Sequence, residues 1–170
     1  MSANFKTLLR NVKCLVFDVD GVLTDGSLII MPDEHIRTMN IRDGFALKTA
    51  VESGFRVIII SGGNSESVRT RLQKLGITEI HLGVENKTDK LNEIFHRYNL
   101  KGEEVLYMGD DIPDYEVMKL CGVPCCPADA CSDIKNISIY VSHTKGGEGC
   151  VRDVIEQVLR LNGKWPVQNK

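Results

Sequence analysis

Short apolar runs alternate with amphipathic segments along most of this chain. The runs that indicate buried strands are rich in β-branched and aromatic residues and occupy residues 12–19, 55–60, 79–82, 105–108 and 137–141. The segments with apolar residues at helical spacing occupy residues 43–53, 65–75, 87–98, 113–121 and 148–161. Strands that alternate with helices are typical of an α/β fold. The pattern therefore predicts a Rossmann-like open parallel sheet with helices on both faces.

One segment departs from this alternation. Two strand-like pieces, 27–31 and 36–41, flank a Pro-Asp-Glu turn and predict a β-hairpin flap over about residues 25–41 that projects from the sheet. Its apolar residues, which indicate a contact between subunits, are Leu28, Ile29, Ile30, Ile36 and Met39. The alternative is a flap that folds onto its own domain. We expect a single domain over residues 1–170, with a C-terminal tail from about residue 162.

Composition narrows the possible partners. The 170 residues are 42% hydrophobic and 26% charged, which suits one globular domain. With 21 Lys and Arg against 23 Asp and Glu, the formal charge is −2, so the protein has no overall cationic field for nucleic acid or an anionic membrane. We find no apolar run long enough to cross a bilayer and expect a cytoplasmic protein without membrane or nucleic-acid partners.

Acidic residues end the first predicted strand. Asp18 and Asp20 are two positions apart, so their side chains can address one site while Val19 points away. Two crowded carboxylates repel each other unless they share a cation or a proton. A hard divalent ion bound by oxygen, Mg²⁺, resolves this conflict. The alternative is that the two aspartates only cap a turn.

Other polar residues reach the same edge of the sheet. Ser61 and Gly62 end a strand and offer a hydroxyl group and open backbone N–H groups for phosphate oxygens. Lys87 opens a helix after a short loop and brings one positive charge. Three more acidic residues follow the predicted strand 105–108: Asp110, Asp111 and Asp114. Because ligands bind at the carboxyl ends of such strands, these residues predict a metal-dependent phosphate site.

These motifs, in this order, resemble those of a known superfamily. The stretches DVDGVLTD (18–25) and GDDIPD (109–114), the strand ending in SG and the loop lysine are similar to the four motifs of the haloacid dehalogenase-like phosphatases. NIRDG (40–44) and GGEGCVRD (146–153) resemble the 3-deoxy-D-manno-octulosonate 8-phosphate phosphatases, a branch without a cap domain. The intervals between the motifs are too short to hold a cap. The resemblance implies a homotetramer in which neighbouring subunits close the site.

The resemblance also implies a role for each motif residue. Asp18 would attack phosphorus to form an aspartyl-phosphate, and Asp20 would protonate the leaving oxygen and then activate water. The implied ligands of Mg²⁺ are Asp18, the backbone carbonyl of Asp20, and Asp110. Lys87, Ser61 and Gly62 would hold the phosphate oxygens. Asp111 and Asp114 would orient metal-bound water and the lysine, with capping of the following helix as the alternative for Asp114.

The substrate is the least determined part of this prediction. The resemblance implies that Arg42, Asp43, Gly44 and Arg71 contact a keto sugar acid, and that the reaction releases phosphate from 3-deoxy-D-manno-octulosonate 8-phosphate in lipopolysaccharide sugar biosynthesis. Many relatives have an arginine directly after the glycine of the second motif, where this chain has Gly63. A nine-carbon keto acid 9-phosphate therefore stays an alternative. Outside this class, the alternatives are a non-catalytic oligomerisation module and a phospho-acceptor domain.

Overall fold

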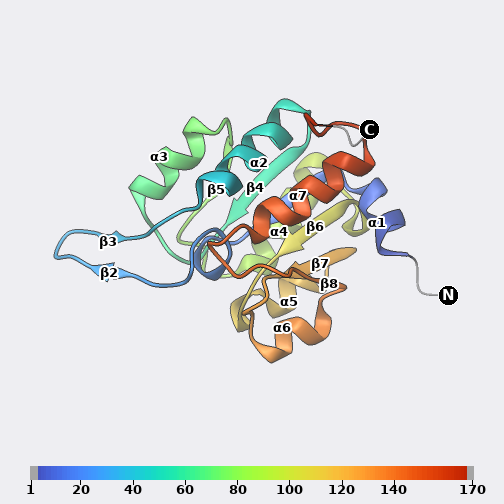
Figure 1. Ribbon diagram of the computed structural model, residues 1–170. Coiled ribbons are helices and arrows are strands. Elements are labelled where there is room, and N and C mark those ends of the chain that lie inside the picture. The colour runs from blue at the N-terminus through green and yellow to red at the C-terminus, as the bar shows by residue number, and fades with distance from the viewer. Residues whose placement is uncertain (1–3, 168–170) are drawn as a thin grey trace.

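The computed structural model describes residues 4–167, and six parallel strands form its central sheet (Figure 1). In chain order they are β1 (Cys14–Phe17), β4 (Arg56–Ile60), β5 (Glu79–His81), β6 (Val105–Met108), β7 (Val123–Cys126) and β8 (Tyr140–Val141). Their order across the sheet is β5-β4-β1-β6-β7-β8, and every neighbouring pair is parallel. The predicted open parallel sheet is confirmed.

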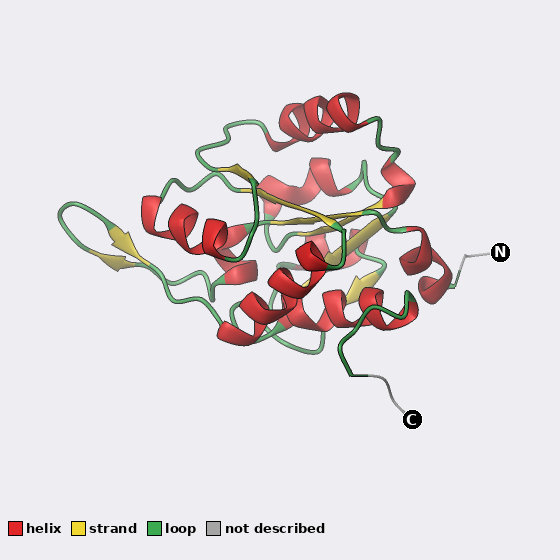
Figure 2. Cartoon of the chain, turned by 90° about the horizontal axis from the view of Figure 1, so that it is seen from above, coloured by secondary structure: helices red, strands yellow, loops and turns green. Residues whose placement is uncertain are grey.

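Helices cover both faces of the sheet (Figure 2). One face packs on α1 (Phe5–Asn11), α2 (Ile41–Glu52), α3 (Glu66–Lys74) and α7 (Cys150–Leu161). The other packs on α4 (Lys87–Tyr98), α5 (Tyr115–Met118) and α6 (Ser132–Ile137). Successive residues of β1 divide between the two cores: Leu15 and Phe17 enter the first and Val16 the second. Because β1 is buried on both faces, its sequence is apolar throughout and does not alternate between apolar and polar residues.

Several elements differ from the prediction: the helix predicted over 113–121 is reduced to α5, and the short helix α6 was not predicted. The strand β7, Val-Pro-Cys-Cys, was not predicted because it contains a proline; it lies between β6 and β8, and the carbonyl of Pro124 accepts a hydrogen bond from the Ile139 amide. The predicted strand 137–141 is reduced to β8, because α6 takes residue 137. The seven-residue helix α1 is too short to show a period, and Asn4 caps it.

The predicted hairpin is confirmed as two very short strands, β2 (Ile29–Ile30) and β3 (His35–Ile36), which project from the body of the protein (Figures 1 and 2). Its apolar side chains face solvent, with Ile29 58% and Ile30 66% exposed. Met39 differs, since it packs against the core below the hairpin. The hairpin also touches α3, where the hydroxyl of Ser67 donates to the carboxylate of Glu34. Its apolar face is thus available for a contact beyond this chain.

The C-terminal tail lies on the helices of its own chain. Trp165 is buried, and its ring meets Phe45 of α2 edge to face with the ring centroids 5.9 Å apart. Residues 168–170 of the predicted tail lie outside the described part of the chain. Among residues 4–167, we find no helix with the length and apolar character needed to span a bilayer.

Candidate active site

The carboxyl ends of three adjacent strands bring the predicted site residues together. β4, β1 and β6 are neighbours in the sheet, and Ser61, Asp18 and Asp110 follow their last residues closely. Lys87 arrives from the loop after β5 as the first residue of α4, which Asn86 caps. The pocket they form has a volume of about 530 Å³. It is lined by Asp18, Asp20, Gly21, Gly26, Ser61, Gly62, Gly63, Val84, Glu85, Lys87, Asp110, Asp111, Pro113 and Asp114.

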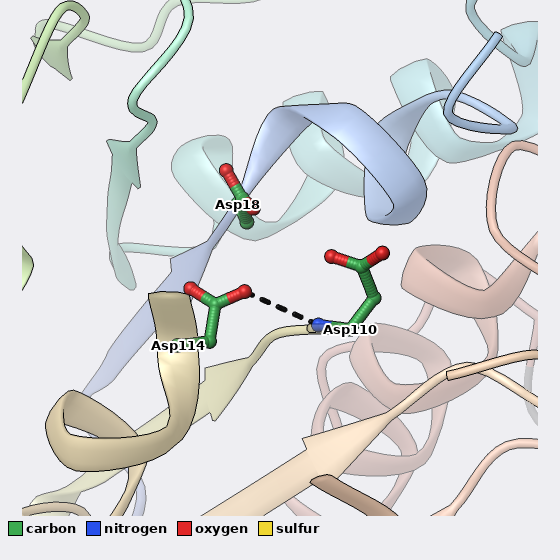
Figure 3. Close-up of side chains that lie close together, drawn as sticks. All are labelled: Asp18, Asp110 and Asp114. Carbon is green, nitrogen blue, oxygen red and sulfur yellow. Dashed lines mark hydrogen bonds between the residues drawn. The ribbon is translucent and has the colours of Figure 1, made fainter. Parts of the chain in front are cut away.

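Three carboxyl groups of this pocket form a possible metal site. One oxygen each of Asp18, Asp110 and Asp114 lies within 4.8 Å of the others, and Figure 3 shows these side chains at the ends of β1 and β6 and on the turn after β6. Burial, followed by repulsion from neighbouring carboxylates, raises the pKa of Asp18 to about 7 and that of Asp110 to about 7. Such a crowded set of oxygen donors needs a cation, and its chemistry suits Mg²⁺.

Glycine is required where the metal ligands meet. The carboxylate of Asp110 lies directly over Gly21, and a Cβ atom at this position would overlap it. Gly21 also has a φ of +85°, in the left-handed region that side chains disfavour. The glycine of the first motif therefore allows the end of β1 and the loop after β6 to approach each other.

A buried lysine partly neutralises this acidic pocket. Nζ of Lys87 lies 3.0 Å from Oδ2 of Asp18 and 2.7 Å from Oδ1 of Asp114. Burial lowers the pKa of Lys87, but attraction to these two carboxylates outweighs it and raises the pKa above its ordinary value. The ammonium group therefore stays charged beside the predicted nucleophile.

Asp114 positions its neighbours. Its Oδ1 accepts hydrogen bonds from Lys87 and from the hydroxyl of Tyr107 at 2.9 Å, and its Oδ2 accepts from the backbone N–H of Asp110 at 3.2 Å (Figure 3). Since both oxygens are engaged, its expected role in orienting the lysine is supported. The alternative role of Asp114, capping of the following helix α5, is wrong, because its side chain makes no capping hydrogen bond. The sequence analysis did not predict Tyr107 as a residue of the site. Its one signal in the sequence is its position on the face of β6 that α4 and α5 cover.

The Ser61-Gly62 turn is held against the loop that leads to Lys87. The carbonyl of Ser61 accepts from the amide of Val84, and the carbonyl of Gly63 accepts from the amide of Gly83, both at 3.0 Å. Ser61 is buried at the pocket wall, where its hydroxyl accepts from the Gly63 amide at 3.3 Å. A rigid turn places this hydroxyl group for a phosphate oxygen.

Asp20 lines the pocket but lies outside the three-carboxylate cluster. Its backbone is extended within the kinked turn η1 (Val19–Leu23), and its side chain pairs with Arg37, which follows β3. No motif pointed to Arg37, because only the folding of the hairpin brings it there. Asp111 is exposed on the pocket wall, and its role stays a prediction.

The four residues predicted to contact the sugar acid, Arg42, Asp43, Gly44 and Arg71, do not line this pocket. Asp43 is buried and accepts a hydrogen bond from the Arg152 amide at 2.7 Å, near the start of α7. Gly44 packs against Arg71, since a Cβ on the glycine would lie 2.7 Å from Nη2 of that arginine. Arg42 is exposed at a separate cavity beside Arg152. These four residues join α2 to α3 and α7, and their contact with substrate stays a prediction.

The fold and the pocket define a class of protein. A central parallel strand ends in a buried aspartate, and a serine turn, a buried lysine and a second acidic loop surround it, as expected for a metal-dependent phosphate-ester hydrolase. The family model described as haloacid dehalogenase-like hydrolase matches residues 40–122.

Known proteins narrow this class. The 3-deoxy-D-manno-octulosonate 8-phosphate phosphatase of Salmonella typhi is 36% identical over 166 residues, which cover 96% of this chain and 88% of the relative. The crystal structure of the enzyme of that name from Yersinia pestis matches with a TM-score of 0.92 and 31% identity, over 96% of this chain and 89% of that one. A crystal structure of the enzyme of that name from Moraxella catarrhalis, in complex with a magnesium ion, a phosphate ion and KDO, matches with a TM-score of 0.90 and 28% identity. The match covers 95% of this chain and 93% of that one.

The chain belongs to the haloacid dehalogenase-like hydrolases and, within them, to the family of the 3-deoxy-D-manno-octulosonate 8-phosphate phosphatases. The resemblance inferred from the sequence motifs is confirmed.

Proposed function

We propose that this protein is an Mg²⁺-dependent phosphatase that releases phosphate from 3-deoxy-D-manno-octulosonate 8-phosphate, in the synthesis of a lipopolysaccharide sugar. The observation that carries the proposal is the buried Asp18–Lys87 pair beside Asp110, in a pocket that Ser61 also lines. The relatives named for this substrate match nearly the whole chain, which supports the choice of sugar.

The first step is attack by Asp18 on phosphorus. A bond forms between a carboxylate oxygen of Asp18 and phosphorus, and the bond from phosphorus to the sugar oxygen breaks. An anionic nucleophile and a phosphate repel each other by about 4 kcal/mol per pair of unit charges at about 4 Å and an effective dielectric constant of about 20. Lys87 offsets part of this repulsion, and Asp114 holds it in place. Bound Mg²⁺, held by Asp18, Asp110 and the Asp20 carbonyl, would supply the remaining positive charge.

Asp20 handles the protons. Its carboxylic acid gives a proton to the departing sugar oxygen, and the resulting carboxylate then takes a proton from water. That water attacks the aspartyl-phosphate, so that a bond from water oxygen to phosphorus forms and the bond to Asp18 breaks. Phosphate leaves, and both aspartates return to their starting states.

The assembly is a second part of the proposal. An open pocket exposes the intermediate to bulk water, and the apolar side chains of the hairpin face solvent. We infer that the hairpin contacts another copy of the chain in a homotetramer whose subunits cover each other's pockets. Light scattering tests this, and a monomer that stays fully active at high dilution would refute it. The cytoplasmic location and the absence of nucleic-acid and membrane partners stay predictions.

The experiment is phosphate release from matched substrates, with and without Mg²⁺. We compare 3-deoxy-D-manno-octulosonate 8-phosphate, a nine-carbon keto acid 9-phosphate and a sugar phosphate without a carboxylate. The eight-carbon substrate should have the highest kcat/KM. Preference for the nine-carbon ester would establish the alternative substrate. No release from any ester would indicate a non-catalytic module, and a stable phosphorylated aspartate without turnover would indicate a phospho-acceptor domain.

A further inference from the structure

An arginine at the base of the hairpin, whose side chain is largely covered, binds the carboxylate of Asp20. Nε of Arg37 lies 2.6 Å from Oδ1 of Asp20, and Nη2 lies 3.0 Å from Oδ2. The two N–H groups therefore meet the two oxygens of one carboxylate. From this geometry, and resting on the function proposed above, we propose that Arg37 is a positioning residue that holds Asp20 in the orientation needed for proton transfer.

The surroundings make this pair stronger than an ordinary surface ion pair. The side chain of Arg37 is only 6% exposed, whereas that of Asp20 is 33% exposed. The cation is thus largely withdrawn from water, and its planar fork fixes both the distance and the plane of the carboxylate. Within residues 4–167, both hydrogen bonds that the Asp20 carboxylate accepts come from this arginine. Without the two hydrogen bonds from Arg37, the partly exposed carboxylate would be free to turn toward water.

The chain leaves space for this pair at Gly63. A Cβ atom on Gly63 would lie 2.9 Å from Oδ2 of Asp20 and 3.0 Å from Nη2 of Arg37. Either distance is too short for an ordinary contact, so a side chain here would push the carboxylate and the guanidinium out of place. The glycine after the Ser61-Gly62 turn is therefore part of the same arrangement.

The hairpin backbone anchors the arginine. Nη1 of Arg37 donates to the carbonyl of His35 in β3 at 3.0 Å, while the other two nitrogens face Asp20. The guanidinium thus bridges the hairpin and the turn after β1. A subunit that contacts the hairpin would act on the same element that orients Asp20.

The test compares Arg37→Met with Arg10→Met, a control that removes the same charge from an exposed site on α1. For each variant we measure kcat and KM with the eight-carbon keto acid phosphate, a sugar phosphate without a carboxylate, and an aryl phosphate. An aryl oxygen leaves without a proton, whereas both sugar oxygens need one. In Arg37→Met, kcat/KM should fall about 30-fold for both sugar esters and less than about 3-fold for the aryl ester. Its kcat should fall for all three, because water activation also uses Asp20.

Two more variants keep the test decisive if Arg37→Met folds poorly. Gly63→Ala, in which Arg37 is still present, should also lower kcat/KM more for the sugar esters than for the aryl ester. Arg37→Lys, which keeps the charge and loses the fork, should recover only part of the sugar-ester activity. Equal losses of kcat/KM for sugar and aryl esters in a folded variant would refute the positioning role. A loss confined to the keto acid ester would also refute it, because Arg37 would then bind the substrate carboxylate. A wild-type protein inert toward all three esters would instead refute the proposed function.

Discussion

Replacement of Asp43 by Asn tests how the junction of α2 and α7 is held together. Oδ1 of Asp43 accepts a hydrogen bond from the Arg152 amide at 2.7 Å, and Oδ2 is buried without a hydrogen-bond partner among the described residues. The whole residue is 1% exposed. Asn keeps the acceptor for the Arg152 amide but removes the charge, so the substitution isolates the cost of burying a carboxylate.

The magnitude follows from the pKa of this group. Burial raises the pKa of Asp43 from 3.8 to about 6, although the hydrogen bond and the positive charge of Arg152 oppose the change. Below pH 3.8 the Asp43 carboxyl group is protonated in both the folded and the unfolded chain, so it does not lower the free energy of unfolding. Between pH 3.8 and 6 the unfolded chain ionises first, and the free energy of unfolding falls as pH rises. The full loss, on the order of 3 kcal/mol, is reached above pH 6.

The assay is unfolding by guanidinium chloride at several pH values, with EDTA present, for wild type and Asp43→Asn. The other titrating groups are common to both proteins, so they cancel in the difference. The stability of the variant relative to wild type should rise by about 2 kcal/mol between pH 4 and pH 7, because part of the loss is already present at pH 4. The unpaired Nδ2 of the new amide adds a cost that does not depend on pH. Asp133→Asn, which removes a carboxylate from an exposed position on α6, is the control for the loss of a charge without burial. A difference for Asp43→Asn that does not change with pH would refute the reasoning.

Three further predictions concern the pocket. Asp18→Asn should abolish turnover and leave the circular dichroism spectrum unchanged, because the nucleophile is lost from an intact fold; substantial remaining activity would exclude the covalent route. Gly21→Ala should raise the Mg²⁺ concentration for half-maximal activity at least about tenfold, since the new methyl group displaces the Asp110 carboxylate. Gly54→Ala is its control, with a φ of +86° and no atom near the new Cβ, and an equal effect there would implicate backbone strain alone. Tyr107→Phe should lower the free energy of unfolding by about 1–3 kcal/mol in denaturant titrations, because it removes the buried donor to Asp114; an unchanged value would show that water replaces the hydroxyl group.

Most of the fold could be predicted because its signals are local. Apolar runs and helical periodicity located β1, β4 and β6, and the helix α4 has the bounds that its pattern predicts, Lys87–Tyr98. The segments that were missed carry weak local signals. β7 contains Pro124, and α1 has seven residues, so tertiary packing rather than propensity decides both.

The site could be predicted to the extent that its residues directly follow strands. Asp18, Ser61 and Asp110 each come just after a central strand, so the parallel topology alone places them at one edge. Arg42 and Arg71, which were predicted to contact the substrate, lie on helices, where sequence position does not determine which cavity a side chain faces. Their predicted contact therefore depends on the assembly.

The sequence by itself determined which groups stand at the carboxyl ends of the strands, and hence the kind of chemistry this protein can perform. Only the tertiary structure decided how these groups are supported. Arg37 reaches Asp20 across 17 residues because the hairpin brings the chain back to the turn after β1, and Asp43 meets the Arg152 amide across 109 residues because α7 packs on α2. The physical reason is that strand and helix patterns act between near neighbours in the chain, whereas a contact between distant side chains depends on the path of the whole backbone.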